Sequence, residues 1–229
     1  MPRLLLIRHG QASFGAADYD QLSPLGQRQC ERLGAYLAQR KAHLPRVLCG
    51  TLRRQQQSLA ALRAGFVQVG IGSAHQLGDA ETWPELDEYD SQALLQALRP
   101  GPLEPADTPE GYRQHFLALR KALLAWMDGT LQPKGMRDYA SFRAGMAKVL
   151  EYTRQSGSDV LVVSSGGPIS TALGLVLQTP AAVTIDFNMR LRNSAITELA
   201  FNAKRHHLQG FNALPHLDDL AFSDWITHT

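Results

Sequence analysis

Short apolar runs alternate along this chain with longer segments in which apolar residues recur every three or four positions. The apolar runs predict buried strands over residues 4–7, 46–49 and 159–163. The helical spacing predicts helices over 24–41, 52–64, 91–98 and 109–127, and further helices after residues 137, 168 and 180. Strands that alternate with helices are typical of a parallel sheet covered on both faces. We therefore expect an α/β fold with three layers, an α/β/α sandwich around a mostly parallel central sheet.

Further strands lie outside this regular rhythm. A short strand is expected somewhere within 69–77, and most of the acidic segment 79–90 is expected to be a solvated loop. Near the end of the chain, residues 194–201 and 207–214 are predicted as a closing pair of strands, with a hairpin loop at 202–205.

Residues 91–137 interrupt the alternation of strands and helices, because they contain two helical patterns separated by a proline-rich stretch. An insertion of this kind is usually found over the C-terminal ends of the strands, where it acts as a lid or specificity element. The insertion is too short to form a domain of its own. We expect a single domain over 1–229, which is within the usual size of one large α/β domain.

Composition narrows the class of protein. The hydrophobic content of 44% and the charged content of 19% are ordinary for a soluble globular protein. The formal net charge of +2 is too weak to indicate a nucleic-acid partner. No apolar run approaches the roughly 18 residues of a membrane span, and the N-terminal run is shorter than the roughly 7–15-residue core of a signal peptide. Because Cys30 and Cys49 are the only cysteines and provide no disulfide framework, we expect a cytoplasmic protein.

The first predicted strand ends abruptly in Arg8, His9 and Gly10. Ligands of open α/β sheets gather outside the carboxyl ends of the strands, which is where these residues are expected. A histidine there can act as a nucleophile, a base or a metal ligand, and an arginine offers a fixed fork of donors to an anion such as phosphate. Taken alone, the triplet is more simply interpreted as a polar strand end followed by a turn.

Two further strands lead to groups that bind anions. The second predicted strand leads to Arg54, and the strand at 159–163 leads through a glycine-rich turn at 165–167 to a helix N-terminus, whose first N–H groups lack partners. With Arg8 they could surround a phosphate, which carries about −1.5 to −2 charges near neutral pH. A neutral His9 could then attack phosphorus while a carboxyl group of the acidic segment protonates the departing oxygen.

Five motifs follow one another along the chain. They are Arg8-His9-Gly10; Leu22-Ser23-Pro24-Leu25-Gly26-Gln27-Arg28-Gln29; Arg54-Gln55-Gln56-Gln57-Ser58; Leu86-Asp87-Glu88; and Asn193-Ser194 before a predicted strand. In this order and spacing they resemble the signatures Arg-His-Gly, Leu-Ser/Thr-x-x-Gly-x-x-Gln, Arg-x-x-Gln-Thr, Leu-x-Glu and Asn-Ser/Thr of the histidine phosphatase superfamily, also called phosphoglycerate mutase-like. The resemblance covers most of the chain.

The resemblance implies a role for each matched residue. His9 would be the nucleophile that becomes phosphohistidine, and Arg8 and Arg54 would clamp the phosphoryl oxygens. Glu88 would protonate the leaving group and, in a phosphatase, would later activate water. Two weaker members of the phosphate loop would be Gln11 and Ser13. The implied partner is a small phosphorylated substrate or inorganic phosphate, or a phosphoprotein.

Neither a cofactor nor a metal is expected. Five further histidines lack the spacing of metal ligands: His75, His115, His206, His207 and His216. Structural or surface positions are the simplest interpretation for all five. His216 lies in a segment that resembles the C-terminal region of the superfamily, so it is a candidate for packing near the site.

The chain departs from the superfamily at position 165. The superfamily usually has a histidine directly before the paired glycines that follow its fourth strand, and here that position is Ser165. A serine donates a hydrogen bond but no positive charge. Loss of one preorganised donor typically lowers a rate by about 10²–10³-fold. Ser165 together with the amides of Gly166 and Gly167 could compensate in part.

Alternatives remain open at this point. The favoured function is a phosphatase that is slowed by the serine, the second is a catalytically silent protein that binds a phosphorylated ligand, and the third is a phosphomutase. Arg54 could instead belong to a solvated helix face, since its neighbours are polar. Glu85 or Asp87 could replace Glu88 as the acid. The sequence does not predict the oligomeric state.

Overall fold

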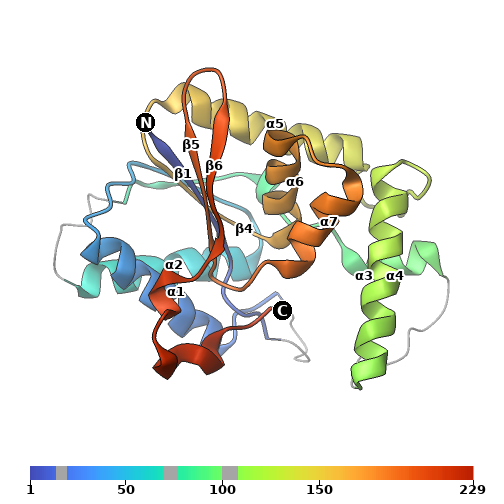
Figure 1. Ribbon diagram of the computed structural model, residues 1–229, viewed down its shortest axis with the longest axis horizontal. Helices are drawn as coiled ribbons and strands as arrows, with labels where there is room; N and C mark the ends of the chain where they lie inside the picture. Colours follow the sequence, from blue (N-terminus) through green and yellow to red (C-terminus); the bar gives the residue numbers. More distant parts are fainter. Residues whose placement is uncertain (14–19, 70–76, 100–107, 229) are drawn as a thin grey trace.

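The computed structural model describes residues 1–13, 20–69, 77–99 and 108–228, which form a six-stranded sheet between layers of helices (Figure 1). The strands lie in the order β3-β2-β4-β1-β5-β6. Their bounds are β1 (Arg3–Arg8), β2 (Arg46–Cys49), β3 (Ala80–Thr82), β4 (Val160–Ser164), β5 (Ile196–Phe201) and β6 (His206–Ala213). β1 to β4 pair in parallel, whereas β5 runs antiparallel to β1 and β6 antiparallel to β5. The expected α/β fold with a mostly parallel sheet is confirmed.

Helices cover both faces of the sheet (Figure 1). α1 (Pro24–Gln39) and α2 (Arg53–Gln68) pack on one face, and α5 (Tyr139–Ser156) and α6 (Gly166–Leu177) pack on the other. The described residues also include α7 (Ala181–Arg190) and the short 3₁₀ helices η2 (Pro84–Leu86), η3 (Pro215–Leu217) and η4 (Leu220–Trp225). No helix in the described part of the chain has the length and apolar character needed to cross a membrane.

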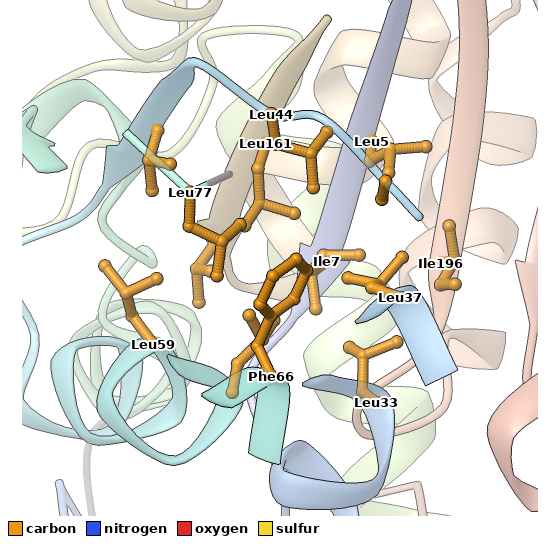
Figure 2. Close-up of a cluster of buried hydrophobic side chains, with 14 of the residues drawn as sticks. Leu5, Ile7, Leu33, Leu37, Leu44, Leu59, Phe66, Leu77, Leu161 and Ile196 are labelled. Atoms are coloured by element: carbon orange, nitrogen blue, oxygen red, sulfur yellow. The ribbon is translucent and has the colours of Figure 1, made fainter. Parts of the chain in front are cut away.

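Alternate residues of β1 point into opposite helical layers, as the pleat of a strand requires. Leu5 and Ile7 belong to the cluster under α1 and α2, in which Phe66 of α2 packs (Figure 2). Leu4 and Leu6 belong to the cluster on the α5 and α6 side. Burial of each such side chain stabilises the fold by roughly 1.5–3 kcal/mol. The continuous apolar run of β1 is explained by these two covered faces.

The helical insertion flanks the C-terminal ends of the strands. α3 (Ser91–Leu98) and α4 (Pro109–Met127) stand beside α5 and α7 (Figure 1). Trp126 of α4 is buried against Phe142 of α5 and Tyr89, with ring centroids 5.3 and 5.7 Å apart. A small pocket lined by these rings also reaches Gly167, directly after β4. The insertion therefore packs next to the turn that the sequence identifies as an anion site.

One strand lies elsewhere than expected. The third strand along the chain is β3, within the acidic segment that was expected to be mostly a solvated loop, and η2 follows it. Most of the expected strand at 69–77 lies outside the described residues. The three residues of β3 are all exposed at the edge of the sheet. An exposed edge strand carries no apolar pattern, so the sequence gives no signal for it.

Candidate active site

The candidate site lies where three parallel strands end side by side. Arg8 at the end of β1 pairs with Ser164 at the end of β4, and the His9 N–H donates to the Ser164 carbonyl at 2.9 Å. Gly50, which follows β2, donates its N–H to the carbonyl of Val163 at 3.3 Å. The loops after β1, β2 and β4 therefore begin next to one another, on the edge where α/β sheets bind ligands.

Two hydrogen bonds fix the proton on the His9 ring. Nδ1 lies 2.7 Å from the carbonyl oxygen of Gly10, which can only accept. Nε2 lies 3.3 Å from Nε of Arg54, which can only donate. Nδ1 must therefore carry the hydrogen, and Nε2 presents its lone pair toward Arg54.

The surroundings of His9 keep the ring neutral. Its side chain is buried, with the residue only 2% exposed. Burial, followed by the charges of Arg8 and Arg54, lowers the pKa of His9 well below its usual 6.5, and the bond to Gly10 opposes this only in part. A neutral imidazole is the form that can act as a nucleophile.

The backbone around His9 is held by neighbouring loops. The backbone N–H of Ser194 and the side-chain amide of Asn193 both donate to the His9 carbonyl, at 3.1 and 3.3 Å. The N–H of Gly10 donates to the hydroxyl of Ser58 at 3.0 Å. The late Asn-Ser motif and the last residue of the Arg54 motif therefore hold the backbone of His9 and Gly10 in place.

The second motif anchors the loop after β1. A Cβ on Gly10 would lie 2.3 Å from the carbonyl oxygen of Gly26 in α1, so the two segments approach at a distance that only glycine allows. The N–H of Gln11 donates to Oε1 of Gln29 at 2.9 Å. The side-chain oxygen of Gln11 accepts from the Ser23 hydroxyl at 2.7 Å. These contacts of Gln11 lie toward α1, and its place in a phosphate loop stays a prediction.

Arg54 is buried at the start of α2, and only 7% of the residue is exposed. Its Nη1 forms an ion pair of 2.7 Å with Asp20, which also accepts from the N–H groups of Arg53 and Arg54 at 2.8 and 3.4 Å. The interpretation of Arg54 as part of a solvated helix face is therefore wrong. Polar neighbours along the helix concealed a side chain that turns inward to His9.

Arg8, at the end of β1, is the second arginine whose charge acts on His9. Its Nη1 donates to the carbonyl of Leu191 and to that of His228 at 3.2 Å. Its charge helps to lower the pKa of both His9 and Glu88. The two arginines thus create a positive potential at the place where the sequence predicts a phosphate.

Glu88 faces this cationic region from the N-terminus of α6. Its two carboxylate oxygens accept from the N–H of Gly167 at 3.0 and 3.1 Å, and Oε1 also accepts from the N–H of Tyr89 at 3.2 Å. Burial raises the pKa of Glu88 above its usual 4.5, against the lowering effects of the Gly167 bond and of the Arg54 charge. A raised pKa favours the protonated form that a general acid needs.

The neighbouring carboxylates of the acidic segment point elsewhere. Asp87 accepts from the backbone N–H of Thr51 at 2.6 Å. The side chain of Glu85 packs beside Gly145 of α5. Among these three acids, Glu88 is the one that contacts the turn after β4.

Ser165 is fully buried at the end of β4, and its hydroxyl oxygen accepts from the side-chain amide of Gln55 at 2.8 Å. Gly166 packs so closely on Asn188 that a Cβ would lie 2.3 Å from the Asn188 side-chain oxygen. Ser13 lies partly buried in the loop after β1, where its N–H donates to the Gln21 carbonyl at 2.7 Å.

Three residues of the site were not singled out from the sequence. Asp20 pairs with Arg54, Ser58 holds Gly10, and Gln55 joins Ser165. Ser58 stands at the last position of a recognised motif, which could have identified it. Gln55 occupies a variable position of that motif, and Asp20 lies in a polar loop, so neither carries a signal in a single sequence.

Other candidate chemistry is weaker. Burial raises the pKa of Cys30 to about 11 and that of Cys49 to about 12, so both thiols remain protonated and poorly nucleophilic. His216 is buried beneath the site, with Nε2 2.9 Å from the hydroxyl of Ser194. Among the residues that the structure describes, no three His, Cys, Asp or Glu side chains are grouped in a way that could hold a metal ion.

Comparison with known proteins supplies the wider context. The family model of the histidine phosphatase superfamily (branch 1) matches residues 4–214. A search of curated proteins finds no match. Among solved structures, the mycobacterial glucosyl-3-phosphoglycerate phosphatase superposes with a TM-score of 0.62 at 20% identity, covering 93% of this chain and 99% of that one. Entamoeba histolytica phosphoserine phosphatase in complex with phosphoserine superposes with a TM-score of 0.63 at 19% identity, covering 95% and 100%. At these identities the structural likeness shows the fold, and the family model shows the lineage: the chain belongs to branch 1 of the histidine phosphatase superfamily.

Proposed function

We propose that this protein is a phosphomonoester hydrolase that acts on a phosphorylated small molecule, or on a phosphoprotein, through a phosphohistidine at His9. The observation that carries the proposal is the state of the His9 ring, which is neutral and presents its Nε2 lone pair to Arg54, while the charge of Arg8 also acts on the ring. Membership of the superfamily supports the reaction class. The ligands in complexes of structural relatives, phosphoserine and inorganic phosphate, support a small phosphorylated substrate.

The contact between Arg54 and His9 gives substrate binding a specific consequence. Nε of Arg54 donates to the lone pair that must attack phosphorus. A phosphoryl oxygen is a stronger acceptor for a guanidinium than a neutral imidazole nitrogen is, because the bond to it is assisted by both charges. Binding of the phosphoryl group would therefore draw Arg54 away from Nε2 and free the nucleophile.

The first half-reaction transfers the phosphoryl group to the protein. The lone pair on Nε2 of His9 forms a bond to phosphorus while the bond from phosphorus to the leaving oxygen breaks. Arg8 and Arg54 balance the charge on the phosphoryl oxygens. Glu88, protonated at the start, gives its proton to the departing oxygen, and a free alcohol leaves.

The second half-reaction returns the protein to its starting state. Glu88 is now a carboxylate and takes a proton from water as the water oxygen forms a bond to phosphorus. The bond between phosphorus and Nε2 breaks, inorganic phosphate leaves, and Glu88 is again protonated. Ser165 and the backbone N–H of Gly166 donate to the phosphoryl oxygens in both halves, and Gln11 and Ser13 are proposed as weaker phosphate-binding residues in the loop after β1.

The test is hydrolysis of an aryl phosphate by the wild type and by His9→Ala. We expect measurable turnover in the wild type and a loss of about 10³-fold or more in the variant, because no other nucleophile occupies that position. His43→Ala, at an exposed histidine outside the site, is the matched control and should retain the activity. Equal turnover in His9→Ala and the wild type would contradict the proposal.

A second candidate function is a silent protein that binds a phosphorylated ligand. The specific observation in its favour is Ser165, which lacks the positive charge of the histidine usual at this position. It predicts phosphate-competitive ligand binding without turnover, and a gain of activity in Ser165→His. We rank it second because the nucleophile, both arginines and the acid are all present. For either function the proposed location is the cytoplasm, on the evidence of two cysteines that are free thiols.

A further inference from the structure

We propose that Gln55 is a positioning residue that aims the Ser165 hydroxyl hydrogen at the phosphoryl group, so that the two residues together replace the missing histidine donor. The inference rests on the proposed phosphate site. Gln55 occupies a variable position of the Arg54 motif, and it has no direct role in the two half-reactions.

The orientation of the Gln55 amide is fixed by three hydrogen bonds. Its oxygen Oε1 accepts from the backbone N–H of Leu52 at 3.4 Å. Its nitrogen Nε2 donates to the Leu86 carbonyl at 2.9 Å and to the hydroxyl of Ser165 at 2.8 Å. Because an N–H group can only donate and a carbonyl can only accept, the amide cannot be turned over without losing these bonds.

Close packing also prevents the amide from moving. The Gln55 residue is fully buried. Its Oε1 lies so near Gly50 that a Cβ there would be 1.9 Å away. The side chain is therefore held in one place, across the end of β2.

A fixed donor on one side determines what the Ser165 hydroxyl can do. Its oxygen already accepts from Gln55, so its own hydrogen must point to a different acceptor. Among the residues that the structure describes, Ser165 has no such acceptor, although it is fully buried. The adjacent Ser164 differs, since its hydroxyl donates to the Leu86 carbonyl at 2.7 Å. A buried hydroxyl hydrogen without a partner carries a desolvation cost, which a bound anion would relieve.

Ser165 lies next to the strand end that carries His9, where the anion is proposed to bind. Ser165 directly follows the residue that pairs with Arg8, and the carbonyl of that residue accepts from the His9 N–H. Gln55 directly follows Arg54, which contacts the His9 ring. Arg54 and Gln55, two consecutive residues of α2, thus contact His9 and Ser165. Gln55 donates to Ser165, and Ser165 would donate to the phosphoryl oxygen. In such a chain of hydrogen bonds each bond strengthens the next.

The test is a double-mutant cycle of Gln55→Met, Ser165→Ala and the double variant. Methionine has nearly the length of glutamine but no amide, so it removes the donor with little change in volume. The readouts are kcat/KM for an aryl phosphate and the dissociation constant of inorganic phosphate. We expect each single variant to lose about 10²-fold in kcat/KM and the double variant to lose no more than the worse single variant, because both changes remove the same donor.

A merely structural role for Gln55 predicts a different result. In that case Gln55→Met would lower activity equally with serine or alanine at position 165, and the two losses would multiply to about 10⁴-fold. Ser164→Ala is the matched control, because it removes a hydroxyl bond to the same Leu86 carbonyl. Its effect should multiply with that of Ser165→Ala. Independent losses in the Gln55 and Ser165 cycle would overturn the inference.

Phosphate affinity separates this inference from the proposed function. If the wild type shows no turnover, the hydrolase proposal fails, but the same cycle measured on phosphate binding still reports whether Gln55 and Ser165 act as one unit. Non-additive losses of phosphate affinity support the pairing. Additive losses, or affinities that do not change, overturn it in a catalytic and in a silent protein alike.

Discussion

Burial acts on two ionisable residues of the site in opposite directions and with a common outcome. It lowers the pKa of His9 and raises that of Glu88, so both side chains are shifted toward their neutral forms. The charges of Arg8 and Arg54 lower both pKa values, so they add to the effect of burial on His9 and oppose it on Glu88. A neutral imidazole and a neutral carboxyl group are the nucleophile and the acid that phosphoryl transfer to histidine requires.

The first prediction concerns Glu88→Gln. For an alkyl phosphate, whose leaving oxygen needs a proton, kcat/KM should fall by about 10²–10⁴-fold. For an aryl phosphate with a good leaving group, the first half-reaction should be almost unaffected, since the leaving group departs as an anion. Water attack still lacks its base, so phosphohistidine should accumulate.

Rapid-quench measurement of the first turnover checks this expectation. The wild type should show less accumulated phosphoprotein than Glu88→Gln with the same aryl phosphate. An equal loss of kcat/KM for both substrates would contradict the assignment of Glu88 as the acid. Asp87→Asn, at the neighbouring carboxylate that faces Thr51, is the comparison variant.

The turn from β4 into α6 positions Glu88. The N–H of Gly167, in the first turn of α6, holds both carboxylate oxygens of Glu88. The N-terminus of a helix attracts negative charge, so this contact stabilises the carboxylate that forms after proton donation. The absence of a side chain at Gly167 is what admits Glu88.

The second prediction compares two glycines in helices. A Cβ on Gly167 would lie 2.1 Å from Oε1 of Glu88 and 2.6 Å from the Tyr89 ring, so Gly167→Ala should displace the acid. A Cβ on Gly145 of α5 would lie 3.0 Å from Cγ of Glu85, a flexible side chain. Gly145→Ala should therefore preserve activity and gain up to roughly 0.5–1 kcal/mol of stability from the lower backbone entropy of alanine.

Chemical denaturation and alkyl-phosphate hydrolysis check this pair. Gly167→Ala should lose alkyl-phosphate activity to an extent similar to Glu88→Gln. Full activity in Gly167→Ala would mean that the contact between the turn and Glu88 does not matter for the reaction.

Elements with a strong apolar period were predictable from the sequence, and exposed ones were not. The bounds of β2, α3 and α4 agree with the expected ranges, and those of β1 and α1 agree to within a few residues. α2 runs to Gln68, beyond its expected end at residue 64. β3 was missed because its residues are exposed and give no pattern. The apolar periodicity of a sequence indicates which residues are buried, and β3 has no buried residue.

Segments that are far apart in the sequence meet around His9 in the folded molecule. Asn193 contacts the His9 carbonyl and accepts from the hydroxyl of Thr227 at 2.9 Å, and that hydroxyl also accepts from Gln29 at 3.0 Å. His216 supports Ser194, whose N–H holds the same carbonyl. The C-terminal segment is therefore part of the support of the site.

The third prediction is sensitivity of the fold to acid. Burial lowers the pKa of His216 from its usual 6.5 to about 3, and the residue is only 3% exposed. Below pH 6.5 the unfolded chain binds a proton at His216 that the folded chain does not bind. The contribution of His216 to the free energy of unfolding is therefore fully present above pH 6.5 and is lost as the pH falls toward 3. The slope from one such group is at most about 1.4 kcal/mol per pH unit.

Urea denaturation between pH 7 and pH 4 measures this slope. His216→Gln should unfold with a weaker dependence on pH than the wild type, whereas His43→Gln, at an exposed position, should leave the slope unchanged. Parallel curves for the wild type and His216→Gln would contradict the role given to His216.

The sequence identified the chemical groups of the site better than their connections. His9, Arg8, Arg54 and Glu88 stand in motifs, and the fold places them around the ends of β1 and β4. The contacts that orient them join residues whose sequence separation is large, such as the 110 positions between Gln55 and Ser165. A single sequence carries no record of such pairs, because neither partner predicts the other.

The central claim is that the phosphoryl group passes through His9, and the most direct measurement is to map a trapped phosphate. Glu88→Gln is incubated briefly with a labelled aryl phosphate, and the label is located by mass spectrometry after proteolysis under alkaline conditions. We expect an acid-labile, base-stable phosphate on His9, and no label in the His9→Ala, Glu88→Gln double variant. Aryl-phosphate hydrolysis without label on His9, or with label on another residue, would contradict it.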